Sequence, residues 1–172
     1  MPPTIMSRFW RRLFGRHREP DSTEVLFDQS VLVGAEVAAS AALPKETGGI
    51  LVGYRTASAV IIERCIEIAD TRASSVAYRR SHAAAERALQ TALADSNTLP
   101  RTGYVGEWHS HPLPCGPSDQ DVRELLRISQ QSPHAVALLV LTPNGPGAWA
   151  ATSWVAQRGR LHAARNGSSL NR

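Results

Sequence analysis

Four side chains suited to metal chemistry lie close together in the sequence, within residues 109–121. His109 and His111 are two positions apart at the end of an apolar run. After a stretch rich in proline and glycine, Ser118 and Asp121 follow three positions apart. Imidazole and carboxylate are ordinary ligands of Zn²⁺, and three protein ligands leave one coordination position open, as in catalytic zinc sites. The spacing therefore indicates a catalytic metal site rather than a structural one.

The elements expected around this motif can bring the four side chains together. Residues 104–108 predict a strand, on which alternate side chains share a face, so both imidazoles project to one side. Residues 118–129 predict a helix, whose first turn places Ser118 and Asp121 on one side. The same two residues also form an ordinary helix N-cap, in which serine accepts from the backbone and an acidic group lies near the positive helix end. The two roles can coexist.

The rest of the chain alternates between strand-like and helix-like patterns. We expect strands at 25–27, 46–54, 59–69, 135–141 and 148–155, and helices at 30–43 and 81–94. The last two strands face each other across a turn at 143–147. The alternation predicts the α/β class, with a mixed central β-sheet flanked by helices. We place a single domain at 23–158 and expect 159–172 to be a loosely structured C-terminal tail.

Charge is distributed unevenly along the 172 residues. Residues 1–20 hold five arginines against one glutamate, whereas the remaining residues hold 14 basic and 14 acidic groups. A neutral body argues against nucleic acid as a partner, because a basic face would then lie on the fold itself. No apolar run is long enough for a membrane span, and two cysteines make no disulfide framework, so we expect a cytoplasmic protein.

The first 22 residues are expected to be a basic amphipathic segment followed by a linker. Within them, residues 5–14 carry apolar side chains at helical spacing opposite arginines. Such a helix docks on a partner protein, packs on its own domain, or lies at an anionic membrane surface. The sequence leaves these three alternatives open.

Three segments together resemble a known signature. Glu46 followed by Thr-Gly-Gly-Ile-Leu-Val-Gly, then His109-Ser-His111-Pro, then Ser118-Asp-Gln-Asp121 are similar to the motif of the JAMM, or MPN-domain, metalloproteases. The resemblance covers about residues 25–156 and implies an MPN-like domain. It also implies one Zn²⁺ per chain, bound by His109, His111 and Asp121. Glu46 would take a proton from the metal-activated water and deliver it to the leaving amine, and Ser118 would donate to the oxyanion.

Two other features of the sequence bear on the ligand set. Six residues, 112–117, separate His111 from Ser118, where the family more often has seven, and Cys115 in this stretch is an alternative zinc ligand. Glu107 shares the face of His109 on a regular strand. It is either an acceptor that orients the imidazole or an exposed or ion-paired strand residue.

The resemblance implies zinc-dependent hydrolysis of a peptide or isopeptide bond at the C-terminal tail of a ubiquitin-like protein, as in deubiquitinase-like cleavage or precursor processing. Bacterial relatives imply a ubiquitin-like conjugation or antiphage system, with E1-like and E2-like proteins as further partners. One alternative is a non-catalytic MPN scaffold that docks protein partners. Another is a zinc hydrolase acting on a small molecule or a nucleic acid, although the neutral body gives nucleic acid little support.

Overall fold

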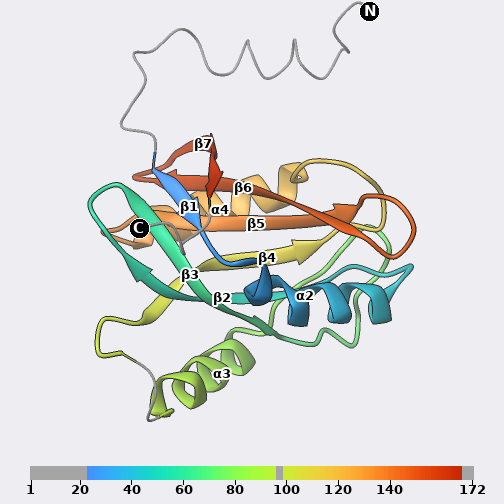
Figure 1. Ribbon diagram of the computed structural model, residues 1–172, viewed down its shortest axis with the longest axis horizontal. Helices are drawn as coiled ribbons and strands as arrows, with labels where there is room; N and C mark the ends of the chain where they lie inside the picture. The colour runs from blue at the N-terminus through green and yellow to red at the C-terminus, as the bar shows by residue number, and fades with distance from the viewer. Residues whose placement is uncertain (1–22, 96–98, 168–172) are drawn as a thin grey trace, which may run out of the picture.

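A strongly curved sheet organises the part of the chain that the computed structural model describes, residues 23–95 and 99–167 (Figure 1). In chain order the elements are β1 (Glu24–Leu26), α2 (Gln29–Ala42), β2 (Thr47–Arg55), β3 (Ala59–Glu67), α3 (His82–Ala94), β4 (Gly103–Ser110), α4 (Asp119–Gln131), β5 (Val136–Pro143), β6 (Trp149–Gln157), β7 (Arg160–Ala164) and β8 (Asn166–Gly167).

The sheet mixes parallel and antiparallel pairs in the order β7-β6-β5-β4-β2-β3-β1-β8. β4 and β5 are parallel, as are β1 with β3 and β1 with β8, and the other neighbours are antiparallel. The side-chain amide of Asn166 in β8 donates to the carbonyl of Ala151 in β6 at 2.9 Å, so the curved sheet nearly closes on itself. The predicted α/β class with a mixed sheet is confirmed.

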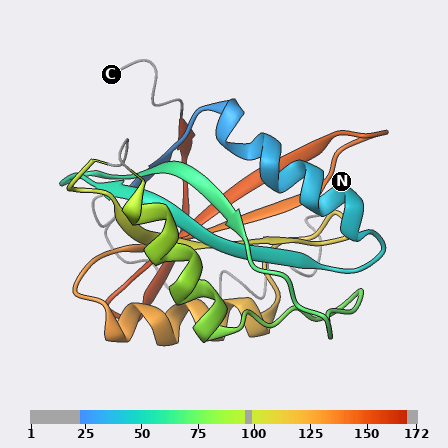
Figure 2. The same cartoon turned by 90° about the horizontal axis from the view of Figure 1, so that it is seen from below.

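Both faces of the sheet are covered by helices. Along β5, Val136 and Leu138 pack with Leu125 of α4. The alternate residue Leu139 packs instead in the cluster that contains Leu32 of α2. Figure 2 shows α3 and α4 on one side of the sheet and α2 on the other. Burial on both faces explains why the β5 sequence is an uninterrupted apolar run.

The start of α4 is fixed by a reciprocal pair of hydrogen bonds. The hydroxyl of Ser118 accepts from the backbone N–H of Asp121 at 3.2 Å, and the carboxylate of Asp121 accepts from the backbone N–H of Ser118 at 2.7 Å. This capping box satisfies N–H groups that have no partner within the helix. The N-cap interpretation of the sequence is therefore confirmed.

The expectation for the C-terminal region is wrong for residues 160–167. Arg158 and Gly159 adopt positive φ angles of 51° and 76°, and this tight turn returns the chain so that β7 pairs with β6. Leu161 is buried in the cluster beneath α4, which anchors the strand. The amphipathic segment predicted at residues 5–14 lies outside the described residues. Among the helices of the described ranges, none has the length and apolar character needed to cross a membrane.

Candidate metal centre

The end of β4 presents the histidines to the face covered by α3 and α4. Trp108 is fully buried in the core on the α2 side, so its neighbours Glu107 and His109 turn to the opposite face. His111 follows β4 directly, and its backbone N–H donates to the carbonyl of Leu141 in β5 at 2.8 Å. The parallel pairing of β4 with β5 thus holds both histidines in place.

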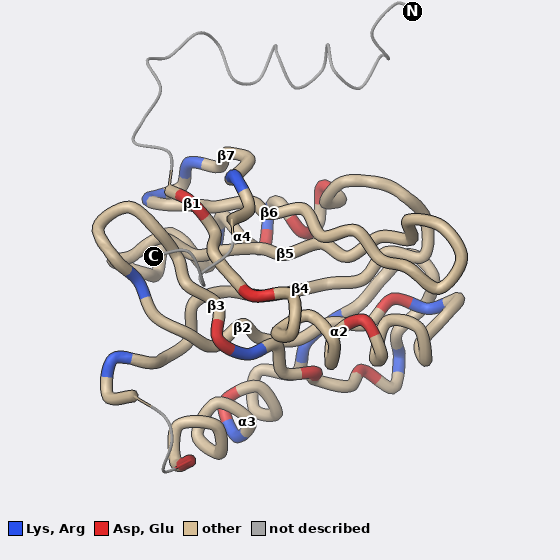
Figure 3. Tube along the Cα trace, viewed as in Figure 1, with Lys and Arg blue, Asp and Glu red and all other residues tan. Residues whose placement is uncertain are grey.

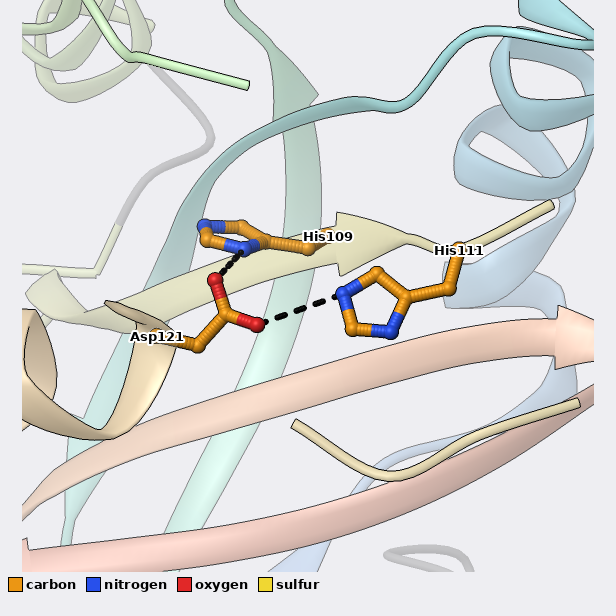
Figure 4. Close-up of side chains that lie close together, drawn as sticks. All are labelled: His109, His111 and Asp121. Atoms are coloured by element: carbon orange, nitrogen blue, oxygen red, sulfur yellow. Dashed lines mark hydrogen bonds and ion pairs between the residues drawn. The ribbon is translucent and has the colours of Figure 1, made fainter. Parts of the chain in front are cut away.

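Asp121, from the first turn of α4, lies between the two imidazoles (Figure 4). Its Oδ1 is 2.9 Å from Nδ1 of His109, and its Oδ2 is 3.3 Å from Nε2 of His111. All three residues are buried, and one donor atom from each lies within 4.8 Å of the others. Two ligands of a tetrahedral zinc ion are separated by about 3.3 Å when the bonds are about 2.0–2.1 Å long. The donor set therefore fits a zinc ion, and it can hold a metal.

The charges of this cluster favour an ionised carboxylate. Burial is the largest influence on Asp121 and raises its pKa, but hydrogen bonds from His109, His111 and Ser118 outweigh it and hold the pKa well below the usual range. Burial likewise opposes the charged form of His109, whereas Asp121 and Glu107 raise its pKa to about 9. Positive charge is thus favoured at this cluster. It can be a proton on His109 or a bound divalent metal ion.

Glu46 directly precedes β2, whose first residue, Thr47, pairs with the end of β4. Its backbone N–H donates to the carbonyl of Ser74 at 2.8 Å, and the following N–H, of Thr47, donates to the hydroxyl of Ser110 at 3.0 Å. The side chain is half-buried, which raises the pKa of the carboxyl. The charge of His111 lowers this pKa, and that of Asp121 raises it. The Glu46 carboxylate therefore interacts electrostatically with His109, His111 and Asp121. It does not belong to the three-donor group.

Ser118 contacts the cluster through Asp121. Its hydroxyl donates to Oδ2 of Asp121 at 2.8 Å while accepting from the backbone of the same residue. In this arrangement the serine orients the carboxylate that faces both histidines. Donation to an oxyanion, the role that the resemblance implies, stays a prediction.

Comparison with known proteins places the chain in a family. A family model described as prokaryotic homologs of the JAB domain matches residues 31–157. The chain belongs to this family. The resemblance to JAMM and MPN-domain proteins that the motifs indicate is thereby confirmed.

One relative and one solved structure illustrate the likeness of this JAB-domain chain to known proteins. The CD-NTase/cGAS isopeptidase of Enterobacter hormaechei subsp. hoffmannii (strain UCI 50) is 31% identical over 123 residues, which cover 66% of this chain and 64% of the relative. The chain thus spans somewhat less than two thirds of that relative's length. A protein of Desulfitobacterium hafniense, known from its solution structure, is 21% identical and aligns with a TM-score of 0.61 over 84% of this chain and 92% of that chain, which supports the fold.

In this JAB domain, Glu107 is both ion-paired and turned towards an imidazole. Its Oε1 accepts from Nε and Nη2 of Arg80 at 2.8 and 2.6 Å, and its Oε2 lies 3.9 Å from Nε2 of His109. Both side chains of the pair are largely buried. The two interpretations that the sequence left open are therefore both partly right, because an ion-paired carboxylate faces the histidine.

Cys115 lies on the far side of His111 from the candidate metal position. Its Sγ is 3.3 Å from Nδ1 of His111, whereas Nε2 of the same ring faces Asp121. The thiol does not belong to the three-donor group among the described residues. The structure therefore gives no support to the thiol as an alternative ligand, and the six-residue stretch 112–117 still brings Ser118 and Asp121 to the histidines.

Sequence reasoning missed three residues that shape the site. Arg80 and Tyr78 lie in the irregular segment before α3, and Gly48 lies in β2 opposite His109. Tyr78 packs edge to face on the imidazole of His109. The residue spacing of an irregular segment does not predict such contacts. The glycine pair after Glu46, in contrast, does indicate close backbone approach.

Proposed function

We propose that this chain is a JAMM-type zinc hydrolase that cleaves a peptide or isopeptide bond at the C-terminal tail of a ubiquitin-like protein. The observation that carries this proposal is the convergence of His109, His111 and Asp121, with the carboxylate of Glu46 in their field. Three ligands and a nearby base are what hydrolysis at a metal requires.

Each residue has a distinct task in this proposal. His109, His111 and Asp121 would hold the zinc. When bound, zinc would supply Lewis acidity, which lowers the pKa of a water molecule towards about 7. Glu46 accepts the proton that the attacking water loses and delivers it to the departing amine. Ser118, at the positive end of α4, would turn its hydroxyl hydrogen bond from Asp121 to the oxygen on which negative charge develops, and would keep its proton.

The name of the Enterobacter relative supports an isopeptide bond as the target. By extension, we propose that the substrate of this chain is a conjugate formed by a bacterial ubiquitin-like system, of the kind that acts on a CD-NTase in antiphage defence. E1-like and E2-like proteins of the same system would be its further partners.

The decisive experiment separates metal binding from catalysis. The purified full chain should contain about one zinc per molecule by elemental analysis, and it should cleave a ubiquitin-like fusion joined through a Gly-Gly amide until a chelator is added. Glu46→Gln should keep the zinc and lose at least about 10²-fold in rate. Glu36→Gln, on α2 and on the other face of the sheet, is the matched control and should cleave normally.

The metal ligands need a readout of their own. Zinc should raise the melting temperature of the wild type and leave that of His109→Ala unchanged, because a ligand stabilises only the state that binds it. Cleavage by Glu46→Gln at the wild-type rate would refute the role of the base. A zinc-loaded wild type that cleaves neither linear nor isopeptide fusions would favour the scaffold alternative.

A further inference from the structure

A cavity of about 460 Å³ opens beside the candidate metal centre. Its walls come from residues 78–80 before α3, from β4, and from the first three turns of α4. His109 and Asp121 both line it. A group that occupies the cavity therefore lies next to the bond that the centre would cleave.

Four arginines line this cavity, and two of them are neutralised within the fold. Arg80 is paired with Glu107, with Nη2 and Oε1 2.6 Å apart. Arg127 is paired with Glu124, which accepts from Nη2 at 2.6 Å and from Nε at 2.9 Å. These two pairs also account for both glutamates in the cavity wall.

Arg79 and Arg123 are the remaining two arginines. Both are exposed, and no carboxylate of residues 23–95 or 99–167 lies within ion-pair distance of either guanidinium. The backbone N–H of Arg79 donates to Asp70 at 2.9 Å, which fixes the main chain and leaves the side chain available. Figure 3 shows basic and acidic residues scattered over both ends of the described chain and the helices, with no single-sign face, so this unpaired positive charge beside the centre is a local property.

The two arginines come from different elements and border one hollow. A guanidinium is a planar fork of donors that matches a carboxylate, and its charge persists at any physiological pH. A lysine or arginine of a substrate would be repelled at the same place. We propose that this cavity is a substrate subsite that binds an aspartate or glutamate side chain within a few residues of the cleaved bond.

This inference rests on the proposed function and specifies its substrate class, an acidic peptide segment next to the bond. The probe is a set of three peptides, acetyl-Ala-Xaa-Gly-Gly-Xaa-Ala-amide, in which both Xaa positions are Asp, Asn or Lys. Each peptide is titrated into the ¹⁵N-labelled, zinc-loaded full chain carrying Glu46→Gln, and binding is followed by NMR. The Asp peptide should bind about tenfold more tightly than the Asn peptide and should shift the Nε–H signals of Arg79 and Arg123. The Lys peptide should bind most weakly.

Variants then assign the preference to the two arginines. Arg79→Ala and Arg123→Ala should each weaken the Asp peptide by about fivefold and leave the Asn peptide unchanged. Arg87→Ala, an exposed arginine of α3 that does not line the cavity, is the matched control and should change neither. Added salt should weaken only the Asp peptide, because exposed charges are screened.

The outcomes distinguish the subsite from the function. Equal binding of the Asp and Asn peptides, or binding of none of the three, overturns the subsite. Cleavage of the ubiquitin-like fusion, measured in parallel on the wild type, reports on the proposed function alone. An intact cleavage rate together with absent acidic preference therefore rejects the subsite and keeps the hydrolase.

Discussion

Tyr78 and His109 meet edge to face, with ring centroids 5.4 Å apart and ring planes at 67°. The tyrosine is itself held, because its hydroxyl donates to the carbonyl of Ile68 at 2.7 Å. Gly48 leaves the space for this contact: a Cβ there would lie 2.8 Å from Cε1 of Tyr78 and 3.1 Å from Cδ2 of His109. The imidazole is thus confined between an aromatic ring and Asp121, which limits its orientation before any metal binds.

Gly48→Ala should therefore damage both the fold and the centre. The added methyl group is also 2.5 Å from the carbonyl oxygen of Trp108, so backbone must move, and overpacking of this kind costs about 1–3 kcal/mol. We expect zinc affinity, measured by competition with a chromophoric chelator, to fall by about tenfold as His109 is displaced. Gly34→Ala in α2, where nothing lies within 4 Å, should instead stabilise by about 0.5–1 kcal/mol in urea unfolding. Wild-type zinc affinity in Gly48→Ala would contradict the account.

Arg80→Ala should be strongly destabilising. It leaves the carboxylate of Glu107 buried without its counter-charge, and breaking a buried pair in this way costs about 3–5 kcal/mol. Arg127→Ala breaks an exposed pair with Glu124 and should cost at most about 1 kcal/mol. Adding Glu107→Gln to Arg80→Ala should recover part of the loss, since the unpaired charge is gone. Equal unfolding free energies for Arg80→Ala and Arg127→Ala would show that the buried pair contributes no more to stability than the exposed pair.

Ser118→Ala should lose two separable contributions. Removing the N-cap of α4 costs about 1 kcal/mol of stability. If the hydroxyl also stabilises an oxyanion, kcat falls by about 10²–10³-fold. Ser81→Ala removes the equivalent cap of α3 and should lose stability without loss of kcat. Ser118→Thr keeps a hydroxyl and should retain activity, and a Ser118→Ala enzyme with unchanged kcat would leave the serine as a helix cap alone.

The two cysteines should differ in their response to pH. Burial raises the pKa of the Cys65 thiol from 9.0 to about 12, whereas Cys115 is exposed. Between these pH values the folded chain keeps a proton on Cys65 that the unfolded chain loses, so stability falls as pH rises from 9 towards 12. Cys65→Ala should reduce this slope in unfolding experiments.

Labelling with iodoacetamide at about pH 8.5, read by mass spectrometry, offers a direct check. The reagent attacks the thiolate, so Cys115 should be modified first and Cys65 only after the addition of urea. Modification of both residues at one rate in the native protein would refute the prediction.

The sequence was most informative where regular structure alone places the side chains. The two-residue spacing of His109 and His111 predicts a shared face on a strand, and the structure brings both imidazoles to Asp121. The Ser-x-x-Asp pattern predicts the cap of α4 because capping depends on neighbours in the chain. Local rules were sufficient for these features.

Contacts across the fold were beyond those rules. Arg80 reaches Glu107 across 27 positions from an irregular segment, and no periodicity encodes that approach. The sequence analysis did not predict β7, because its turn, Arg158-Gly159, is a weak turn signal and the residues that follow it are mostly polar. The sequence could name Glu107 as a candidate, but only the packed structure shows which partners it has.

Asp121 serves the helix and the centre with the same carboxylate, since it accepts from the backbone of Ser118 while it faces both imidazoles. A relative that no longer binds metal would still be stabilised by this aspartate, because its carboxylate caps the first turn of α4. The side chains of His109 and His111 do not cap a helix in this way. Among relatives, loss of either histidine should therefore indicate a protein that no longer binds the metal. Retention of the aspartate alone should not indicate metal binding.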